Sequence, residues 1–248
     1  IETENNFPTS CGLASSSSGM AALTLALCAA VSQSSSLNEL EKKGYSRKKI
    51  SDLARKGSGS ACRSLWGGFV CWMKMNSHIK QYAAQIEESS NWPIEHCVLI
   101  LSDEVKKVSS TLGHSSSWTS PLFKPRLEII PYRIEKMKAA IKEKNLTKLG
   151  ELMEEDCLEM HAVAMSSSPP LFYFQKETSA VLAWLRKKRK ENGLRAYFTL
   201  DAGPNIHLIG EKESLEKIKK DVALFNPKIR VLKSQLGKGP SLKAYPSS

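Results

Sequence analysis

The chain has 248 residues, of which 41% are hydrophobic and 25% charged, with 14 glycines and 11 prolines. This composition is typical of a globular protein and excludes a collagen-like or intrinsically disordered chain, and the length suits one large domain or two ordinary ones. The formal net charge of +11 favours a polyanionic partner. Charge alone leaves open whether that partner is nucleic acid, an anionic membrane or a phosphorylated small molecule.

The sequence favours a cytoplasmic protein that needs no membrane. The longest apolar run, residues 20–31, is about half of the roughly 20 residues that a spanning helix needs, and no basic segment precedes it. We interpret it as a buried core helix. The six cysteines form no C-x-x-C pair and show no metal-ligand spacing with histidine, a pattern that suits a reducing cytosol.

The first residues, 1–6, are strand-like, and because the chain opens with Ile1 we expect its natural start to lie upstream. A loop follows at 7–14. Apolar residues at helical spacing over 20–31, preceded by serines that can cap a helix, predict the first helix.

A polar linker at 32–36 then leads to a Lys-rich helical stretch, a Gly/Ser loop at 57–60 and a strand at 68–73. Trp92-Pro93 marks a plausible domain boundary.

The second half of the chain alternates strands and helices. The pattern predicts a strand at 97–101, helices at 121–144 (broken or kinked at Pro131), 146–165 and 176–192 (ended by Gly193), strands at 196–200 and 206–209, a helix at 213–225 and a strand at 229–233. We therefore predict a two-domain α+β protein with domains at 1–93 and 94–236 and a tail at 237–248.

The segment 5–19, N-N-F-P-T-S-C-G-L-A-S-S-S-S-G, lies between the expected strand and the first helix. Its small residues let the backbone approach a phosphate, its hydroxyls can donate to phosphate oxygens, and the helix that follows presents free N–H groups and a positive dipole end. The segment therefore predicts an anion-binding loop, with a plain Ser-rich helix cap as the alternative.

Three motifs in chain order resemble the mevalonate diphosphate decarboxylase branch of the GHMP small-molecule kinase superfamily. They are the loop at 5–19, the stretch G-S-G-S-A-C-R-S at 57–64, and the stretch Y-F-T-L-D-A-G-P-N at 197–205. Weaker matches lie at 108–111, 119–120, 160–162 and 169–170. The resemblance runs from Asn5 to about Gly210.

This resemblance implies a fold and an assembly. The fold is GHMP-kinase-like, with a partial N-terminal α/β domain of the kind shared with a ribosomal small-subunit protein and a ferredoxin-like C-terminal domain. Substrate would lie in the cleft between the domains, and the protein would be a homodimer. The family's N-terminal strands, with a lysine that contacts substrate phosphate, resemble no segment of this chain.

The resemblance also implies an activity: ATP phosphorylates the tertiary hydroxyl of 5-diphosphomevalonate, and loss of phosphate and carbon dioxide gives isopentenyl diphosphate and ADP. Asp201 would be the catalytic carboxylate and Arg63 would bind the substrate carboxylate. The remaining implied contacts are substrate binding by Ser58, Ser60 and Ser110, ATP phosphate binding by Pro8, Gly12, Leu13, Ala14, Ser15 and Ser16, and a contact of Ser16 with Mg²⁺ through magnesium-ATP.

Other interpretations stay open. Without the family, Asp201 is a turn former and Arg63 half of a surface ion pair. A phosphomevalonate decarboxylase or a non-decarboxylating GHMP kinase would share most motifs, and His114, where the family commonly has Met, leaves the substrate's phosphorylation state open. A basic nucleic-acid-binding protein is a distant alternative, since the charge run at 186–190 is more typical of a solvated helix face. We interpret His161 as a structural histidine.

Overall fold

The computed structural model describes residues 2, 4–7, 14–74, 81–102 and 116–243. They form two compact units, which are described separately. Unit 1 contains the chain up to Pro93, apart from 8–13, together with the segment that starts at Leu236, and unit 2 runs from Ile94 to Gln235.

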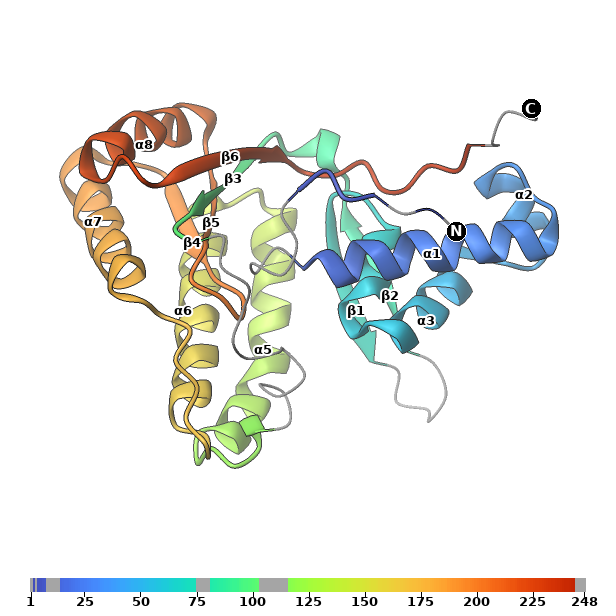
Figure 1. Cartoon of the computed structure of the whole chain (residues 1–248), viewed down its shortest axis with the longest axis horizontal. Helices are drawn as coiled ribbons and strands as arrows, with labels where there is room; N and C mark the ends of the chain where they lie inside the picture. Colours follow the sequence, from blue (N-terminus) through green and yellow to red (C-terminus); the bar gives the residue numbers. More distant parts are fainter. Residues whose placement is uncertain (1, 3, 8–13, 75–80, 103–115, 244–248) are drawn as a thin grey trace. The chain divides into compact units, whose positions relative to one another are not determined.

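Unit 1 consists of short helices and one hairpin (Figure 1). Its elements are α1 (Ser15–Ser32), α2 (Leu37–Lys42), α3 (Arg47–Gly57), the 3₁₀ helix η1 (Gly59–Leu65), the antiparallel strands β1 (Phe69–Lys74) and β2 (Gln81–Glu87), and η2 (Ser89–Asn91). Helices α2 and α3 begin where a serine side chain accepts a hydrogen bond from a first-turn N–H: Ser36 from Glu39 and Ser46 from Lys49. The Lys-rich stretch is therefore two capped helices.

The first helix differs from the expected core helix. Its inner face, with Ala21, Leu25 and Cys28, is buried, whereas the side chains of Leu27 and Val31 are 48% and 74% exposed. Among the described helices, α1 alone is long and apolar enough to cross a membrane, but the same length and composition also occur in core helices of soluble proteins. The sequence did not separate the two faces because almost every residue of this helix is small or apolar.

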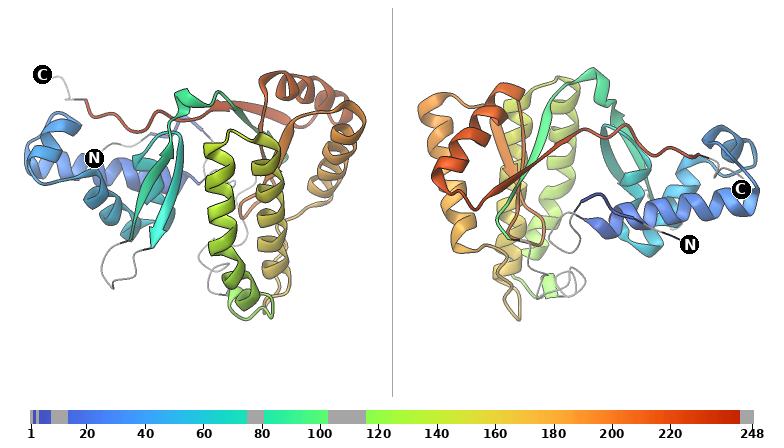
Figure 2. Two further views of the ribbon diagram at one scale, coloured as in Figure 1. Left: turned by 180° about the vertical axis from the view of Figure 1, so that it is seen from behind. Right: turned by 45° about the horizontal axis from the view of Figure 1, so that its top comes forward.

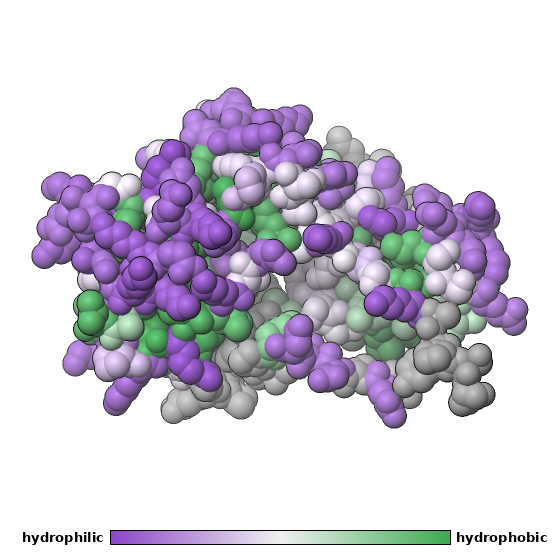
Figure 3. Space-filling model, turned by 90° about the horizontal axis from the view of Figure 1, so that it is seen from above, coloured by the Kyte–Doolittle hydropathy of each residue, from purple (hydrophilic) through white to green (hydrophobic). Residues whose placement is uncertain are grey.

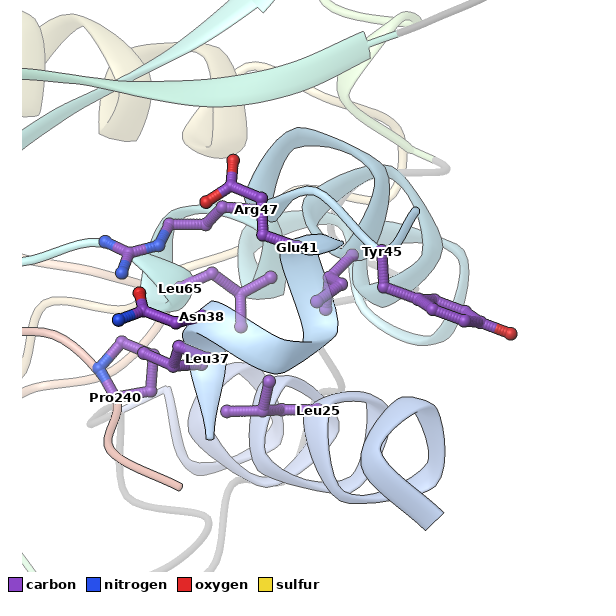
Figure 4. Close-up of a pocket in the computed structure, with 9 residues that line it drawn as sticks. Leu25, Leu37, Asn38, Glu41, Tyr45, Arg47, Leu65 and Pro240 are labelled. Carbon is purple, nitrogen blue, oxygen red and sulfur yellow. The ribbon is translucent and has the colours of Figure 1, made fainter. Parts of the chain in front are cut away.

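The last described residues belong to unit 1. The amide of Gly68 donates to the carbonyl of Gly237 at 2.8 Å, and Leu242 packs against the core of Ala21, Leu25 and Leu40. Figure 4 shows Pro240 beside Leu37 at the edge of a hollow of about 40 Å³. The described part of the segment expected as a tail, residues 237–243, thus packs as part of this unit.

Unit 2 is built on a four-stranded antiparallel sheet. Its elements are β3 (Glu95–Ile100), α5 (Phe123–Lys142), α6 (Leu146–Met165), α7 (Lys176–Asn192), β4 (Ala196–Thr199), β5 (Ile206–Gly210), α8 (Lys212–Phe225) and β6 (Arg230–Gln235). The strand order is β4-β5-β3-β6 with all three pairings antiparallel. In chain order this is the second, third, first and fourth strand with helices in the two crossovers, which is the ferredoxin-like arrangement that we expected.

The sheet buries one face against α7 and α8. Alternate residues of three strands, such as Leu99, Phe198 and Leu208, are at most 1% exposed and pack with Val181 and Ile218 from these helices. The alternation follows from the period of two along a strand. The expected two-domain α+β fold is confirmed, with this core as the larger of the two.

The free edge of β4 is covered by helix side chains. Arg189 donates to the carbonyl of Ala196 at 2.8 Å, and the amide of Phe198 donates to Glu154 at 3.1 Å. Glu154 and Arg189 also form an ion pair with each other. This cover satisfies edge groups that would otherwise invite strand pairing with another chain.

Two expectations about strands and helix breaks were wrong. The described residues among 1–6 form no strand, and no described strand pairs with them, as a strand requires. Helix α5 is continuous through Pro131, so the expected break is absent, while the kink given as the other possibility stays a prediction. The hairpin strand β2 was not foreseen, because its sequence Q-Y-A-A-Q-I-E lacks clear alternation.

Candidate active-site residues

The start of α1 is suited to an anion. Its N-cap, Ala14, has left-handed backbone angles (φ 53°) and offers no side-chain cap, and no acidic residue lies in the first turn. Of the first-turn N–H groups, that of Ser17 donates to the carbonyl of Ala14 at 2.9 Å, while those of Ser15 and Ser16 make no hydrogen bond with a described residue and can face an anion together with the helix dipole. Ser15 is half-buried and Ser16 exposed, so both hydroxyls can reach a bound phosphate.

The serine loop, residues 57–60, leads directly into the buried 3₁₀ helix η1. Ser58 is the C-cap of α3 and Ser60 lies in η1, while Ala61 and Cys62 are fully buried and fix the turn in the core. Burial raises the pKa of the Cys62 thiol, which is therefore a packing group in its protonated form. The turn holds Ser58 and Ser60 on its surface side.

Arg63 projects from this turn into solvent. Its side chain is exposed and makes no hydrogen bond or ion pair with a described residue. The other described arginine of the loop region, Arg55, is bound to Asp52 at 2.7 Å and to the carbonyl of Gln81. Arg63 is thus a cation on a rigid support that remains available to a ligand, rather than half of a surface ion pair.

The structure brings the helix start and the serine loop together. Ser17, buried in the first turn of α1, shares a hydrogen bond between its hydroxyl and that of Ser60. A Cβ on Gly57 would meet the methyl group of Met20 at 2.0 Å. Ser15 and Ser16, expected to bind ATP, therefore lie in the helix turn that contacts Ser60, expected to bind substrate, within unit 1.

Asp201 lies in unit 2, in the turn that joins β4 to β5. Its carboxylate is exposed and forms no hydrogen bond or ion pair with a described residue, while its carbonyl accepts from the amide of Gly203 at 2.8 Å. Asn205 fixes the far end of the turn, because its side chain accepts from the amides of Leu101 and Ser102 at 2.8 and 3.2 Å. Thr178 of α7 donates to the carbonyl of Pro204 at 3.1 Å.

Helix α6 holds the near end of the same turn. The amide of Leu200 donates to the sulfur of Cys157 at 3.2 Å, and the thiol donates back to the carbonyl of Leu200 at 3.8 Å. His161 faces the Leu200 backbone and the Asp201 carboxylate, and its ring packs on Phe174 with the centroids 4.4 Å apart. Asp201 is exposed, but its backbone is held on both sides.

Burial keeps the groups behind Asp201 uncharged. It lowers the pKa of His161 to about 4, against the opposing effects of the Leu200 backbone and the Asp201 carboxylate. Burial likewise raises the pKa of Cys157 to about 11. At neutral pH neither His161 nor Cys157 is charged.

Several expected site residues lie outside the described part of the chain: Pro8, Gly12, Leu13, Ser110 and His114. The sequence did not single out Ser17, Cys157 or Thr178, whose partners are distant in sequence. Asn205 is the last residue of the D-A-G-P-N motif. Its side chain anchors the end of the turn by accepting hydrogen bonds from two backbone amides.

The charge run at 186–190 is largely engaged within unit 2. Arg189 pairs with Glu154, Lys188 with Asp221 at 3.0 Å, and Arg186 lies over the ring of Phe198 at 5.9 Å. The outer surface of α7 and α8 is hydrophilic (Figure 3). The run is therefore part helix surface and part structural support, and it does not form a row of unpaired cations.

These features define a class: a two-unit α+β protein with an anion-suited helix start beside a serine loop and with an exposed carboxylate on a fixed turn. Comparison with known proteins agrees. The family "Mevalonate 5-diphosphate decarboxylase C-terminal domain" matches residues 96–244, and "Diphosphomevalonate decarboxylase-like N-terminal domain" matches residues 1–84. The chain belongs to the mevalonate 5-diphosphate decarboxylase family.

Individual relatives support this assignment. The diphosphomevalonate decarboxylase of Saccharomyces cerevisiae is 41% identical over 223 residues, which are 86% of this chain and 54% of the relative. The crystal structure of mevalonate diphosphate decarboxylase from Staphylococcus aureus matches with a TM-score of 0.81 and 33% identity, over 95% of this chain and 69% of that one. A solved complex with MVAPP, AMPPCP and magnesium matches with a TM-score of 0.80 and 32% identity, over 96% and 70%. The chain spans about half the length of the curated relatives it matches.

Proposed function

We propose that the protein to which this chain belongs catalyses the ATP-dependent decarboxylation of 5-diphosphomevalonate to isopentenyl diphosphate, with release of ADP, phosphate and carbon dioxide. The observation that carries the proposal is Arg63: an exposed guanidinium without a described partner, at the end of a serine loop packed against an anion-suited helix start. The relatives named above are further support.

Magnesium-ATP is the proposed nucleotide. The start of α1 suits it, because the first turn combines the N–H groups and hydroxyls of Ser15 and Ser16 with the absence of an acidic side chain. Ser16 is the proposed hydroxyl toward the metal. Bound there, magnesium-ATP would supply the phosphoryl group while the metal offsets part of the phosphate charge. The same residues give no support to a nucleic-acid or membrane partner.

Arg63 and the serine loop are the proposed substrate contacts. A guanidinium can donate two parallel N–H bonds to a carboxylate, which fixes its plane, and the Ser58 and Ser60 hydroxyls can donate to phosphate oxygens. When the carbon–carbon bond breaks, its electron pair forms the new double bond as phosphate leaves, so the carboxyl group becomes neutral carbon dioxide. Arg63 orients the carboxylate for this loss.

Asp201 is the proposed group that orients and accepts the proton of the tertiary hydroxyl. Its carboxylate is exposed, and the Leu200 backbone before it is fixed by Cys157. Burial lowers the pKa of His161 to about 4, so near pH 7 its ring adds no positive charge beside the carboxylate. The oxygen that loses its proton then accepts the phosphoryl group and later leaves with it.

We further propose that the protein is a cytoplasmic homodimer, as the family resemblance implies. The oligomeric state is measured by sedimentation of the full-length protein, and a monomer at micromolar concentration would contradict this part alone.

The activity is tested by incubating full-length protein with ATP, magnesium and either 5-diphosphomevalonate or 5-phosphomevalonate, while carbon dioxide and ADP are measured. The proposal expects equal amounts of both products with the diphosphate. Carbon dioxide from the monophosphate only would identify the alternative decarboxylase. ADP without carbon dioxide would identify a kinase and overturn the assigned role of Arg63.

A further inference from the structure

The first turn of α1 and the serine loop are fitted to each other by two contacts. The hydroxyls of Ser17 and Ser60 share a hydrogen bond, and the Met20 methyl group occupies the space where a side chain on Gly57 would begin. Ser17 is only 6% exposed. A buried hydroxyl needs a partner, and in the described part of the chain Ser60 provides it.

This bond leaves Ser60 able to bind a ligand as well. A hydroxyl has one donor hydrogen and two acceptor lone pairs, so Ser60 can interact with Ser17 and still contact a phosphate or a neighbouring group. Ala61 and Leu65 fix the backbone of η1 in the core, and the bond to Ser17 sets how the Ser60 hydroxyl is oriented on that support. A shift of the first turn of α1 therefore moves the hydroxyl of Ser60.

We propose that the Ser17–Ser60 pair couples nucleotide binding at the start of α1 to substrate binding at the serine loop, with Ser17 as a positioning residue that contacts neither ligand. The inference rests on the proposed function, which places the two ligands on these two segments. Coupling of this kind is reciprocal: each ligand must tighten the other by the same factor. The ligand that binds first orders the Ser17–Ser60 pair, so the second ligand loses less conformational entropy when it binds.

The test is calorimetric titration of full-length protein with magnesium-AMPPCP, with and without saturating 5-diphosphomevalonate. The ratio of the two dissociation constants is the coupling factor. Ser17→Ala removes one hydroxyl, and alanine is a good helix former, so the variant should fold. We expect its coupling factor to fall by about fivefold, the low end of typical site-to-site coupling, with little change in nucleotide affinity without substrate.

Ser18→Ala is the matched control. The Ser18 hydroxyl donates to the carbonyl of Ser15 at 3.1 Å, within the same helix, and should leave the coupling factor within twofold of the parent. The double variant Ser17→Ala, Ser60→Ala is compared with Ser60→Ala alone, at saturating substrate. Its coupling factor should fall no further, because the single variant has already lost the bond between the two hydroxyls.

An unchanged coupling factor in Ser17→Ala, with both ligands bound by the parent, would overturn the inference and leave the proposed function intact. An equal loss in Ser18→Ala would also overturn it, because the effect would then belong to the helix and not to the pair. A parent protein that binds neither ligand would refute the proposed function and this inference together.

Discussion

Asp201 and Arg63 have one property in common: neither side chain is bound by another described residue. Arg126, Arg133 and Arg189 are each bound to carboxylates, whereas Arg63 and Asp201 are exposed and make no such bond. Both stand on backbone that is fixed by buried neighbours. Charged groups that are rigidly supported but not satisfied by the protein are available for a ligand.

Asp201→Asn should abolish turnover and leave ligand binding nearly unchanged. The amide keeps the shape of the carboxylate but removes its charge and basicity, and the loss of a positioned base costs on the order of 100-fold or more in kcat. The measurement is steady-state carbon dioxide release, with AMPPCP affinity as the check on binding. Activity within tenfold of the parent would rule out Asp201 as the base.

Arg63→Lys should weaken substrate recognition more than nucleotide binding. An ammonium group cannot make the two parallel bonds of a guanidinium, and the loss of a charged hydrogen bond corresponds to about 10- to 100-fold in kcat/KM. Arg195→Lys is the control, since Arg195 forms an exposed ion pair with Glu211 at 3.0 Å. A defect confined to ATP affinity would assign Arg63 to the nucleotide site.

The sequence identified these two residues through their motifs, but it could not show what supports them. Nothing in the spacing of Cys157 and Leu200, 43 positions apart, indicates that a thiol fills the hydrogen-bonding role of a neighbouring strand. His161 is buried, as a structural histidine would be, but its Nε2 has no hydrogen-bond partner among the described residues, and its place beside Asp201 emerged only from the packing of α6 on β4. Such contacts depend on tertiary structure and leave no local signal.

Acid should destabilise unit 2 partly through His161. Its pKa is about 4 in the folded chain and 6.5 in the unfolded reference, so between these values the unfolded state binds the extra proton and stability falls as pH falls. His161→Gln should reduce the loss of unfolding free energy between pH 7 and pH 5 by about 2 kcal/mol. The measurement is urea unfolding at both pH values. Equal losses in parent and variant would show that His161 is already solvated in the folded state.

At the scale of elements, helices α5 and α6 lie side by side in both views of Figure 2 and are joined by an ionic cluster. Arg133, 3% exposed, reaches Glu155, Asp156 and Glu159 at 3.2, 3.0 and 2.6 Å. Hydrogen bonds to these carboxylates, Glu159 foremost, raise the pKa of Arg133 above its usual range and keep it charged. Because the carboxylates are about a third or more exposed, each pair is partly screened.

Arg133→Gln should destabilise the α5–α6 pair by about 2 kcal/mol, below the usual cost of breaking a fully buried ion pair because of that exposure. Lys148→Gln removes a cation from the same two helices, but its contact with Glu143 is at the surface, with side chains 44% and 55% exposed. Surface pairs contribute about 0–1 kcal/mol. Thermal unfolding of both variants tests the difference, and equal shifts would mean that burial of Arg133 adds nothing.

The elements that the sequence located best are those with strong local signals. Helix α6 has the predicted bounds and begins at Asn145, whose side chain accepts from the amide of Lys148, and α7 ends at Gly193 with φ 63°. The hairpin strand β2 was missed, since its fit depends on pairing with β1. Local capping chemistry is readable from sequence, whereas strand pairing is a contact between distant segments.

At the scale of the whole molecule, the chain enters unit 1 twice. After β6 it leaves unit 2 at Gln235 and packs against the Gly67-Gly68 turn, which directly follows η1. A Cβ on Gly67 would lie 2.5 Å from the backbone of Lys238, and one on Gly68, at φ +65°, would lie 2.2 Å from the carbonyl of Glu87. The turn is glycine because two backbones cross there without room for a side chain.

Gly67→Ala should therefore displace the segment 236–243 from unit 1. The clash is with backbone and not with a flexible side-chain end, so one of the two segments must move, at a cost of about 1–3 kcal/mol. Gly237→Ala is the matched control, because a Cβ there meets nothing within 4 Å although its carbonyl accepts from Gly68.

Hydrogen exchange of peptides covering 236–243 is the measurement. Gly67→Ala should exchange at least tenfold faster there, as the loss of about 1.4 kcal/mol or more implies, and Gly237→Ala should exchange as the parent does. Unchanged protection in Gly67→Ala would show that the crossing is loose enough to absorb a methyl group, and the last segment would then contribute little to holding the turn that follows Arg63.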